Sequence, residues 1–279
     1  MFNINVIWLT SGGNAFFQEL YDSTKHAIPE ILQKEYKYSG RGPLRLPLFK
    51  ESKEYEYVLN RVLEHCGDIK DIVYEETVYT KEEEEKVEFF SLFLSTPLTN
   101  QGKYLSDYGT KFEGGCPFCG RGKKLVGDAY INRNFVKKYD FAALEYGYVF
   151  LSNYVKTLIE ENSFTGIKFP ARLLDYKGRE IPEYYCPKFE NILPQMSEKT
   201  WVYTDDFLKR YDICGHHPRF LRSSVKYTRT ALKDAMDFNL SKEYFNCMQN
   251  QEIIISKRVR DLFKKQKIRA WPLPVQIVD

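Results

Sequence analysis

The residues best suited to chemistry are the two cysteines of the segment Cys116-Pro117-Phe118-Cys119-Gly120. Two thiolates separated by two residues on a tight turn can both face one tetrahedral Zn²⁺, and neighbouring glycines allow the backbone to bend. A structural zinc site needs two further ligands. The spacing therefore predicts a zinc-ribbon-like knuckle that recruits a second pair of ligands from elsewhere in the chain.

Cys186 and Cys214 are the candidates for this second pair. Cys186 is followed by proline and Cys214 by glycine, so together they look like a CPxCG knuckle that is split by an insertion. Closing such a long loop is tolerable because loop entropy rises slowly with length. His216 and His217 are alternative fourth ligands, since imidazole and thiolate both bind structural zinc. We predict a zinc site formed by Cys116, Cys119, Cys186 and Cys214.

The sequence does not favour an enzyme. A zinc ion held by four protein ligands is structural, because catalytic zinc keeps an open position for water. The chain carries no HExxH, GxSxG or P-loop motif, and nothing in it indicates a general base. A redox role for the CxxC pair is disfavoured because glycines flank it where a helix would be expected. Cys66 and Cys247 lie in apolar helical contexts and are interpreted as buried hydrophobic residues.

Composition excludes several other classes of protein. The 279 residues are 43% hydrophobic and 28% charged, which is typical of a globular chain and not of a collagen-like or disordered one. Apolar stretches are too short for a membrane span, and the run Ile4–Leu9 favours a first strand over a signal peptide. We therefore expect a cytoplasmic protein. The aromatic content of 16% suits a surface that contacts another macromolecule.

Charge is unevenly distributed along the chain. Residues 50–100 contain six basic and thirteen acidic residues (6 − 13 = −7), whereas residues 218–270 contain thirteen and five (13 − 5 = +8). These regions are either solvated faces of one fold or a surface that binds a partner. Candidate partner-binding residues are Glu82, Glu83, Glu84, Glu85, Arg219 and Arg222.

A nucleic-acid-binding zinc ribbon is the alternative function. Basic residues recur three or four apart and interleave with Phe220 and Tyr227, so they could line one helical face and follow phosphates. These residues are Arg219, Arg222, Lys226, Arg229 and Lys233. The acidic first half of the chain would repel the same partner, which makes this the second choice.

The periodicity predicts an N-terminal α/β domain over residues 1–105 and a C-terminal zinc-ribbon-like region over 106–279. A strand is expected at Asn5–Thr10 and helices at Phe16–Tyr21 and Glu54–Cys66, where apolar residues recur at helical spacing. The segment Asp71–Leu94 favours a hairpin, because Val, Phe and Tyr dominate both arms around an acidic tip. A helix that starts in the acidic run is the competing interpretation.

The C-terminal region contains an internal similarity at an offset of 104 residues. The segments 147–175 and 251–279 each predict a strand, a serine N-cap, a short amphipathic helix and a closing strand. Ser152 and Ser256 are the caps, whose hydroxyls would accept from a free N–H of the first helical turn. The predicted fold class is α/β (α+β), with mixed small sheets, short helices, an inserted knuckle and two similar strand-Ser-helix-strand units.

The knuckle at 116–120, the segment FLSNYVKTLIEENSFTGIKF and its second copy IIISKRVRDLFKKQKIRAWPL resemble double-CXXCG-motif proteins and related immunity proteins of bacterial polymorphic toxin systems. The resemblance covers about half of the chain, from Tyr108 onwards, and departs from the pattern in having one intact knuckle and one split pair. It implies a non-catalytic protein that neutralises a cognate toxin by direct binding, with zinc as a structural cofactor.

Overall fold

The computed structural model describes residues 2–9, 14–33, 44–66, 73–94, 109–137, 139–200, 202–204, 213–217, 219–221, 223–246 and 250–279. The chain has an α+β fold and divides into two compact units. Unit 1 comprises Met1–Lys86 and Arg222–Ser224, and unit 2 comprises Val87–Leu221 and Val225–Asp279. Within the described residues, no helix is long and apolar enough to cross a membrane.

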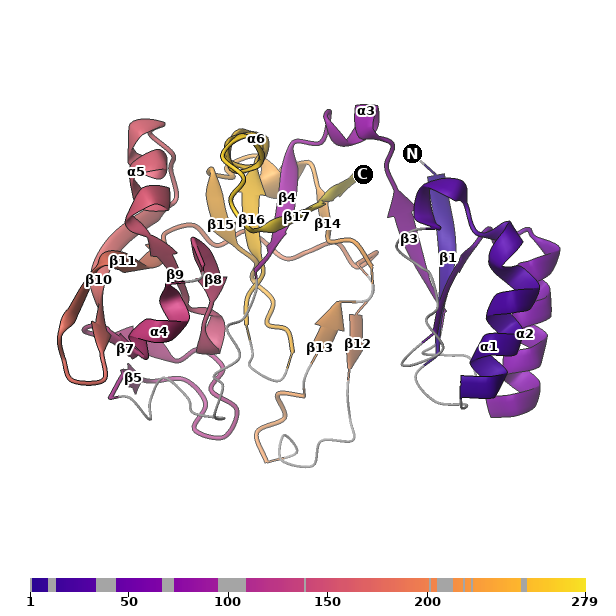
Figure 1. Cartoon of the computed structure of the whole chain (residues 1–279), viewed down its shortest axis with the longest axis horizontal. Helices are drawn as coiled ribbons and strands as arrows, with labels where there is room; N and C mark the ends of the chain where they lie inside the picture. The colour runs from indigo at the N-terminus through magenta and orange to yellow at the C-terminus, as the bar shows by residue number, and fades with distance from the viewer. Residues whose placement is uncertain are drawn as a thin grey trace. The chain divides into compact units, whose positions relative to one another are not determined.

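Unit 1 is a three-stranded antiparallel sheet in the order β2-β1-β3, with two helices side by side against it (Figure 1). Its elements are β1 (Phe2–Leu9), α1 (Asn14–Thr24), η1 (Lys25–Ala27), η2 (Glu30–Leu32), β2 (Leu44–Leu48), α2 (Lys53–Cys66), β3 (Val73–Val78) and α3 (Lys81–Glu84). The predicted first strand and both predicted helices are confirmed. Three apolar positions of α2, Tyr55, Val58 and Val62, are buried on one face as its periodicity requires, whereas Leu63 is exposed.

The first half of unit 2 carries the intact knuckle. Its elements are β5 (Lys111–Glu113), β6 (Lys124–Val126), β7 (Ala129–Ile131), α4 (Arg133–Val136), β8 (Phe141–Ala143), η4 (Glu145–Gly147), β9 (Val149–Ser152), α5 (Asn153–Glu161), β10 (Ile167–Asp175) and β11 (Glu180–Phe189). Strands β7 to β11 form one sheet in the order β7-β10-β11-β9-β8. Strands β5 and β6 form a separate antiparallel hairpin around the knuckle.

The second half of unit 2 has a similar sequence of elements, without counterparts of η4 and β11. Its elements are β12 (Val202–Thr204), β13 (Arg219–Leu221), β14 (Lys226–Thr228), η6 (Thr230–Leu232), β15 (Phe238–Leu240), β16 (Ile253–Ser256), α6 (Lys257–Lys265), β17 (Trp271–Pro274) and β18 (Gln276–Val278). Here β12 and β13 form the hairpin, and β14 pairs in parallel with β18 as β7 does with β10. The internal similarity seen in the sequence is therefore part of a longer repeat that includes a hairpin and the strands that follow it.

The two copies agree in backbone detail. Ser152 and Ser256 cap their helices by accepting from the N–H groups of Val155 and Val259, as predicted. Both helices end in a Schellman motif, with Ser163 (φ 51°) and its counterpart Lys267 (φ 55°) in the left-handed region. The serine N–H groups also make equivalent bonds, to the carbonyl oxygens of Asp140 (2.8 Å) and Asp237 (3.0 Å).

One hydrophobic core joins the two copies. It contains Val155 and Ile159 of α5, Val259 and Phe263 of α6, and strand residues from both sheets. The ring of Phe263 packs edge-on against Phe141 of the first copy. Tyr154 donates to the Oε1 atom of Gln266 at 2.8 Å, so the two helices are also linked at the surface. The copies are therefore halves of one body.

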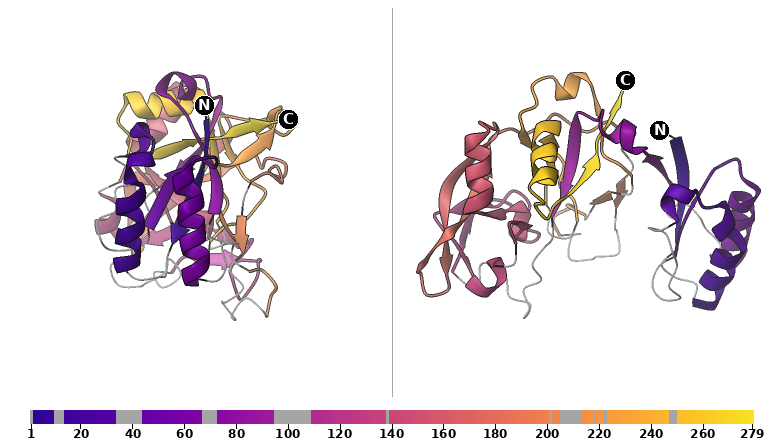
Figure 2. Two further views of the ribbon diagram at one scale, coloured as in Figure 1. Left: turned by 90° about the vertical axis from the view of Figure 1, so that its right-hand side faces the viewer. Right: turned by 45° about the horizontal axis from the view of Figure 1, so that its top comes forward.

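The second copy takes its central strand from the start of unit 2. In the first copy, β11 lies between β9 and β10; in the second, β4 (Phe89–Phe93) lies between β16 and β17, although it precedes both copies in the sequence (Figures 1 and 2). The repeat is thus circularly permuted. For this reason the compact units divide after Lys86, earlier than the predicted boundary at residue 105.

The predicted hairpin over Asp71–Leu94 is wrong. Strand β3 pairs with β1, whereas β4 pairs with β16 and β17. The acidic run forms the short helix α3, which begins with a capping box between Thr80 and Glu83. The competing interpretation, a helix that starts in the acidic run, is the one observed. Similar β propensity in two segments does not establish that they pair with each other.

The permuted strand leads to a test with two fragments. Fragment 87–279 should unfold cooperatively, whereas fragment 106–279 should not, because it lacks Phe90 and Leu92, which are 0% and 4% exposed. Burying each such side chain contributes roughly 2 kcal/mol, a large part of a stability that is typically about 5–15 kcal/mol. Thermal and urea unfolding followed by circular dichroism would compare them. A cooperative transition in fragment 106–279 would contradict the assignment of β4.

Candidate metal centre

The first knuckle is a tight turn between β5 and β6 that is fixed by its own backbone. Cys116 N–H donates to the carbonyl of Arg121 (2.8 Å), and Gly120 N–H donates to the carbonyl of Cys116 (2.9 Å). Gly120 has a φ of +77°, and a Cβ atom there would overlap the ring of Tyr146. Glycine is therefore required after the second cysteine for both conformation and space.

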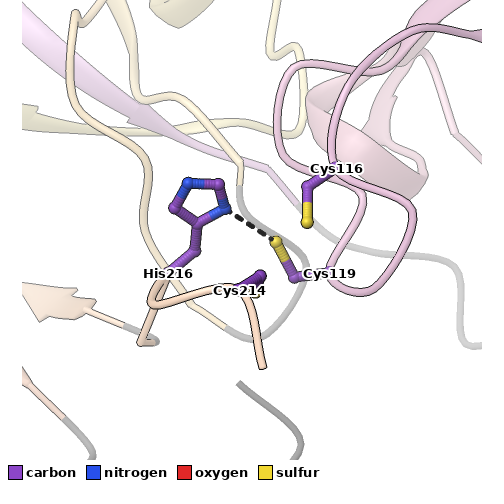
Figure 3. Close-up of side chains that lie close together, drawn as sticks. All are labelled: Cys116, Cys119, Cys214 and His216. Carbon is purple, nitrogen blue, oxygen red and sulfur yellow. Dashed lines mark hydrogen bonds between the residues drawn. The ribbon is translucent and has the colours of Figure 1, made fainter. Parts of the chain in front are cut away.

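The second knuckle lies between β12 and β13 and contributes Cys214 and His216. Figure 3 shows the ring of His216 pointing toward Cys119, with Cys214 on the same loop as His216. The three sulfur atoms and one histidine nitrogen all lie within 4.8 Å of one another. The Nδ1 atom of His216 lies 3.4 Å from the sulfur of Cys119, within hydrogen-bonding distance. Residues far apart in sequence thus form one cluster of four donors.

This donor set can hold a metal ion. Four ligands placed tetrahedrally about 2.0–2.3 Å from a metal are roughly 3.5–3.8 Å apart, so the cluster needs only a small contraction to reach that geometry. Cys119 is buried, and the other three ligands are half-buried. Each copy of the repeat supplies two ligands. A bound metal would therefore cross-link the two hairpins.

The local environment shifts the pKa values of the two thiols of the first knuckle in opposite directions. The backbone N–H of Cys119 donates to the Cys116 sulfur and lowers the pKa of that thiol, with smaller contributions from Phe118 and His216. Burial raises the pKa of Cys119 above its usual range. Metal binding requires thiolates, so an incoming ion must displace the Cys119 proton.

Cys186 does not belong to the cluster, which corrects the predicted set of ligands. It lies on β11 opposite Ala171, is 1% exposed and packs in an apolar core with Phe150 and Leu173. Burial raises the pKa of this thiol to about 12. The fourth member of the cluster is instead His216, one of the two histidines considered as substitutes, whereas His217 is not part of the cluster.

The sequence contains a pattern that relates the second knuckle to the first. Residues 211–215 read Tyr-Asp-Ile-Cys-Gly, which is a CxxCG frame with tyrosine in place of the first cysteine. Gly215 has a positive φ of 65°, as Gly120 has in the first knuckle. Cys214 thus corresponds to Cys119, and β13 follows it at the same spacing as β6 follows Cys119. Aligning Cys214-Gly215 with Cys119-Gly120 identifies this relation. Combining Cys214-Gly215 with Cys186-Pro187 does not.

The other predicted site residues that the structure describes do not belong to the cluster. Glu82, Glu83, Glu84 and Glu85 lie in or beside α3 of unit 1, where Glu83 caps the helix. Arg219 lies on β13, and Arg222 lies outside the described residues, as does Cys247. The expected basic helical face is not formed, because Arg219 and Lys226 lie on separate strands. Lys226 is also buried, and Arg229 pairs with Glu88 at 2.9 Å.

Comparison with models of known protein families and with curated proteins found no match for the chain. Its function must therefore be inferred from the chemistry of its own residues.

Substitution of Cys186 distinguishes the observed cluster from the predicted one. The Cys186→Ala variant should bind one Co²⁺ per chain with unchanged thiolate-to-cobalt absorption, and lose about 1–2 kcal/mol of unfolding free energy because a buried group is removed. The matched Cys214→Ala variant should lose the tetrahedral cobalt spectrum. Loss of the spectrum in Cys186→Ala alone would show that the wrong cysteine has been assigned.

The tyrosine in the second frame gives a rescue experiment. His216→Ala should weaken Co²⁺ binding at least about tenfold, because one of four ligands is lost. Adding Tyr211→Cys to that variant should restore tight binding with a four-sulfur spectrum, since it completes the CxxCG frame. Tyr211→Ser in the same background is the control and should restore nothing. Equal cobalt affinity in the Cys and Ser double variants would refute the proposed frame.

Proposed function

We propose that the chain is a non-catalytic, immunity-like protein of the cytoplasm that neutralises a cognate toxin by binding it, and that Cys116, Cys119, Cys214 and His216 hold one structural Zn²⁺. The observation that supports the metal is the convergence of four donor atoms within 4.8 Å. Thiolate and imidazole donors favour zinc over magnesium or calcium, which prefer oxygen. Three sulfurs and one nitrogen form a common structural zinc set.

The zinc would stabilise the relation between the two copies of the repeat. The Cys119–His216 contact joins residues 97 positions apart. Each knuckle sits on a short two-stranded hairpin, and an isolated hairpin is only marginally stable in water. Structural zinc can contribute on the order of 10 kcal/mol to the folded state. Cross-linking the hairpins would thus turn two weak elements into one rigid surface.

Direct binding is favoured over catalysis by the same ligand set. With four protein ligands no position is left for a metal-bound water, so this ion would supply no nucleophile. The two Cys-Gly knuckles and the paired strand-Ser-helix units are the features that resemble double-CXXCG immunity proteins. That resemblance supports capture of a toxin as the role of the scaffold.

Metal removal tests the zinc part of the proposal. Purified protein should contain one Zn²⁺ per chain by elemental analysis, and a chelator such as EDTA should lower the Tm of unit 2 by more than 10 °C, because metal binding energy is folding energy. The Cys116→Ser variant should lose both the metal and the chelator effect. Protein purified with no metal, and unable to take up Zn²⁺, would contradict this part.

Toxin neutralisation is tested in cells. Co-expression with the product of the neighbouring gene should restore the growth that this product alone abolishes, and the two proteins should co-purify at moderate salt. The double variant Cys116→Ser/Cys119→Ser should not protect. Failure to protect, combined with oligonucleotide binding whose affinity falls steeply with salt, would favour the nucleic-acid-binding alternative instead.

A further inference from the structure

We infer that the partner-binding surface is formed by the tips of the two knuckles beside the metal centre, and that it fits an acidic protein face containing an apolar pocket. This inference rests on the proposed function and names the contact region. It concerns Phe118 and Ile213, which are the apolar contacts, and the basic residues around them. The surface is called the knuckle face below.

The knuckle face carries two exposed apolar side chains at equivalent positions. Phe118 is 60% exposed and directly precedes Cys119, while Ile213 is 68% exposed and directly precedes Cys214. The sulfur atoms of the two cysteines lie within 4.8 Å of each other, so the two apolar residues flank the same cluster. Folding gives no reason to expose a large apolar side chain at the same place in both copies. Contact with a partner does.

The backbone that presents Phe118 is fixed by its own hydrogen bonds. The turn around Phe118 is closed by the Cys116–Arg121 and Gly120–Cys116 hydrogen bonds, and Gly120 packs against the ring of Tyr146. Bound metal would fix the second tip against the first. A rigid surface loses little conformational entropy on binding, which suits it to contribute affinity.

Both hairpins that carry the tips contain basic side chains. Residues 109–127 contain four basic residues and one acidic residue (4 − 1 = +3). Arg121 lies over the ring of Tyr244 at 4.8 Å, and Arg219 of the second hairpin lies over the ring of Phe245 at 6.0 Å. The two guanidinium groups therefore contact the rings of consecutive residues. Lys123 lies 4.5 Å from the ring centre of Tyr146. An acidic partner would be complementary in charge.

The apolar contacts favour a protein partner over a nucleic acid. Single-stranded nucleic acid is held by aromatic rings on which bases stack, and Ile213 has no such ring. An exposed isoleucine gains most by entering an apolar pocket. Apolar anchors surrounded by complementary charge are typical of protein interfaces.

A second exposed apolar group provides the matched control. Trp271 and Leu273 on β17 are 51% and 56% exposed, and Trp271 contacts Phe93 on β4. This group has a similar exposed fraction but lies on a different element. Comparing the two pairs therefore distinguishes specific binding at the knuckle face from nonspecific binding by exposed apolar side chains.

The probe is a fluorescent random copolymer of glutamate and tyrosine, which presents acidic and apolar groups together, with oligo-dT as the nucleic-acid comparison. Fluorescence anisotropy should show that the zinc-loaded full chain binds the copolymer more tightly than oligo-dT. The double variant Phe118→Ser/Ile213→Ser should weaken copolymer binding at least about tenfold, as expected when two anchors are lost. Trp271→Ser/Leu273→Ser should change it less than about threefold.

The charge component is tested in parallel. Arg121→Gln should weaken copolymer binding several-fold at low salt, whereas Lys177→Gln, at the exposed turn between β10 and β11, should not. Zinc content is measured on every variant, so a failed metal site is seen separately from a failed surface. Copolymer binding that is absent in the full chain, equal in both double variants, or weaker than oligo-dT binding would overturn the inference.

Discussion

Three sulfur atoms and one imidazole nitrogen within 4.8 Å of one another impose an electrostatic constraint on unit 2. Thiolates at that distance repel, so without a cation at least some of these thiols must keep their protons. The buried Cys119 thiol is the one whose pKa rises, and the Cys116 thiol is the one stabilised as a thiolate by backbone N–H groups. A divalent metal removes this conflict and uses every donor. The geometry of both hairpins depends on how that constraint is met.

The repeat explains why the donors come together. Each copy carries a hairpin, three strands, a serine-capped helix and a closing strand, and the copies share one core through α5 and α6. Once the helices pack, the hairpins at the start of each copy can contribute equivalent cysteines, Cys119 and Cys214, to one centre. The shared core thus positions the ligands, and the metal would fix the loops that the core leaves weakly held.

Sequence reasoning predicted local features well. The helix over 53–66 and the caps at Ser152 and Ser256 follow from short-range periodicity and hydroxyl chemistry, and they are present. Cys116 and Cys119 both belong to the cluster, as the spacing of the pair predicts. In these cases the interacting groups lie within a few residues of one another, so the sequence displays them directly.

The failures involve partners that are distant in sequence. Strand β4 looked like an arm of a local hairpin, but it is the central strand of a sheet built from residues after 230. Cys186 looked like a ligand beside a proline, but the register of β11 directs it into the core. The residues around β4 and Cys186 do not encode these outcomes, because register and sheet order are set by packing across the whole unit.

The two knuckles contribute the same number of donors to the cluster, but one donor differs in residue type. The frame at 211–215 has tyrosine where the first knuckle has Cys116, and His216, just after the glycine, supplies the fourth donor. Two side chains that differ in chemistry and in position along the turn thus complete the same cluster. A constraint on donor number and distance, but not on residue identity, accounts for this. Such a constraint is what a structural metal imposes, since the ion requires four donors and is indifferent to the loop that carries them.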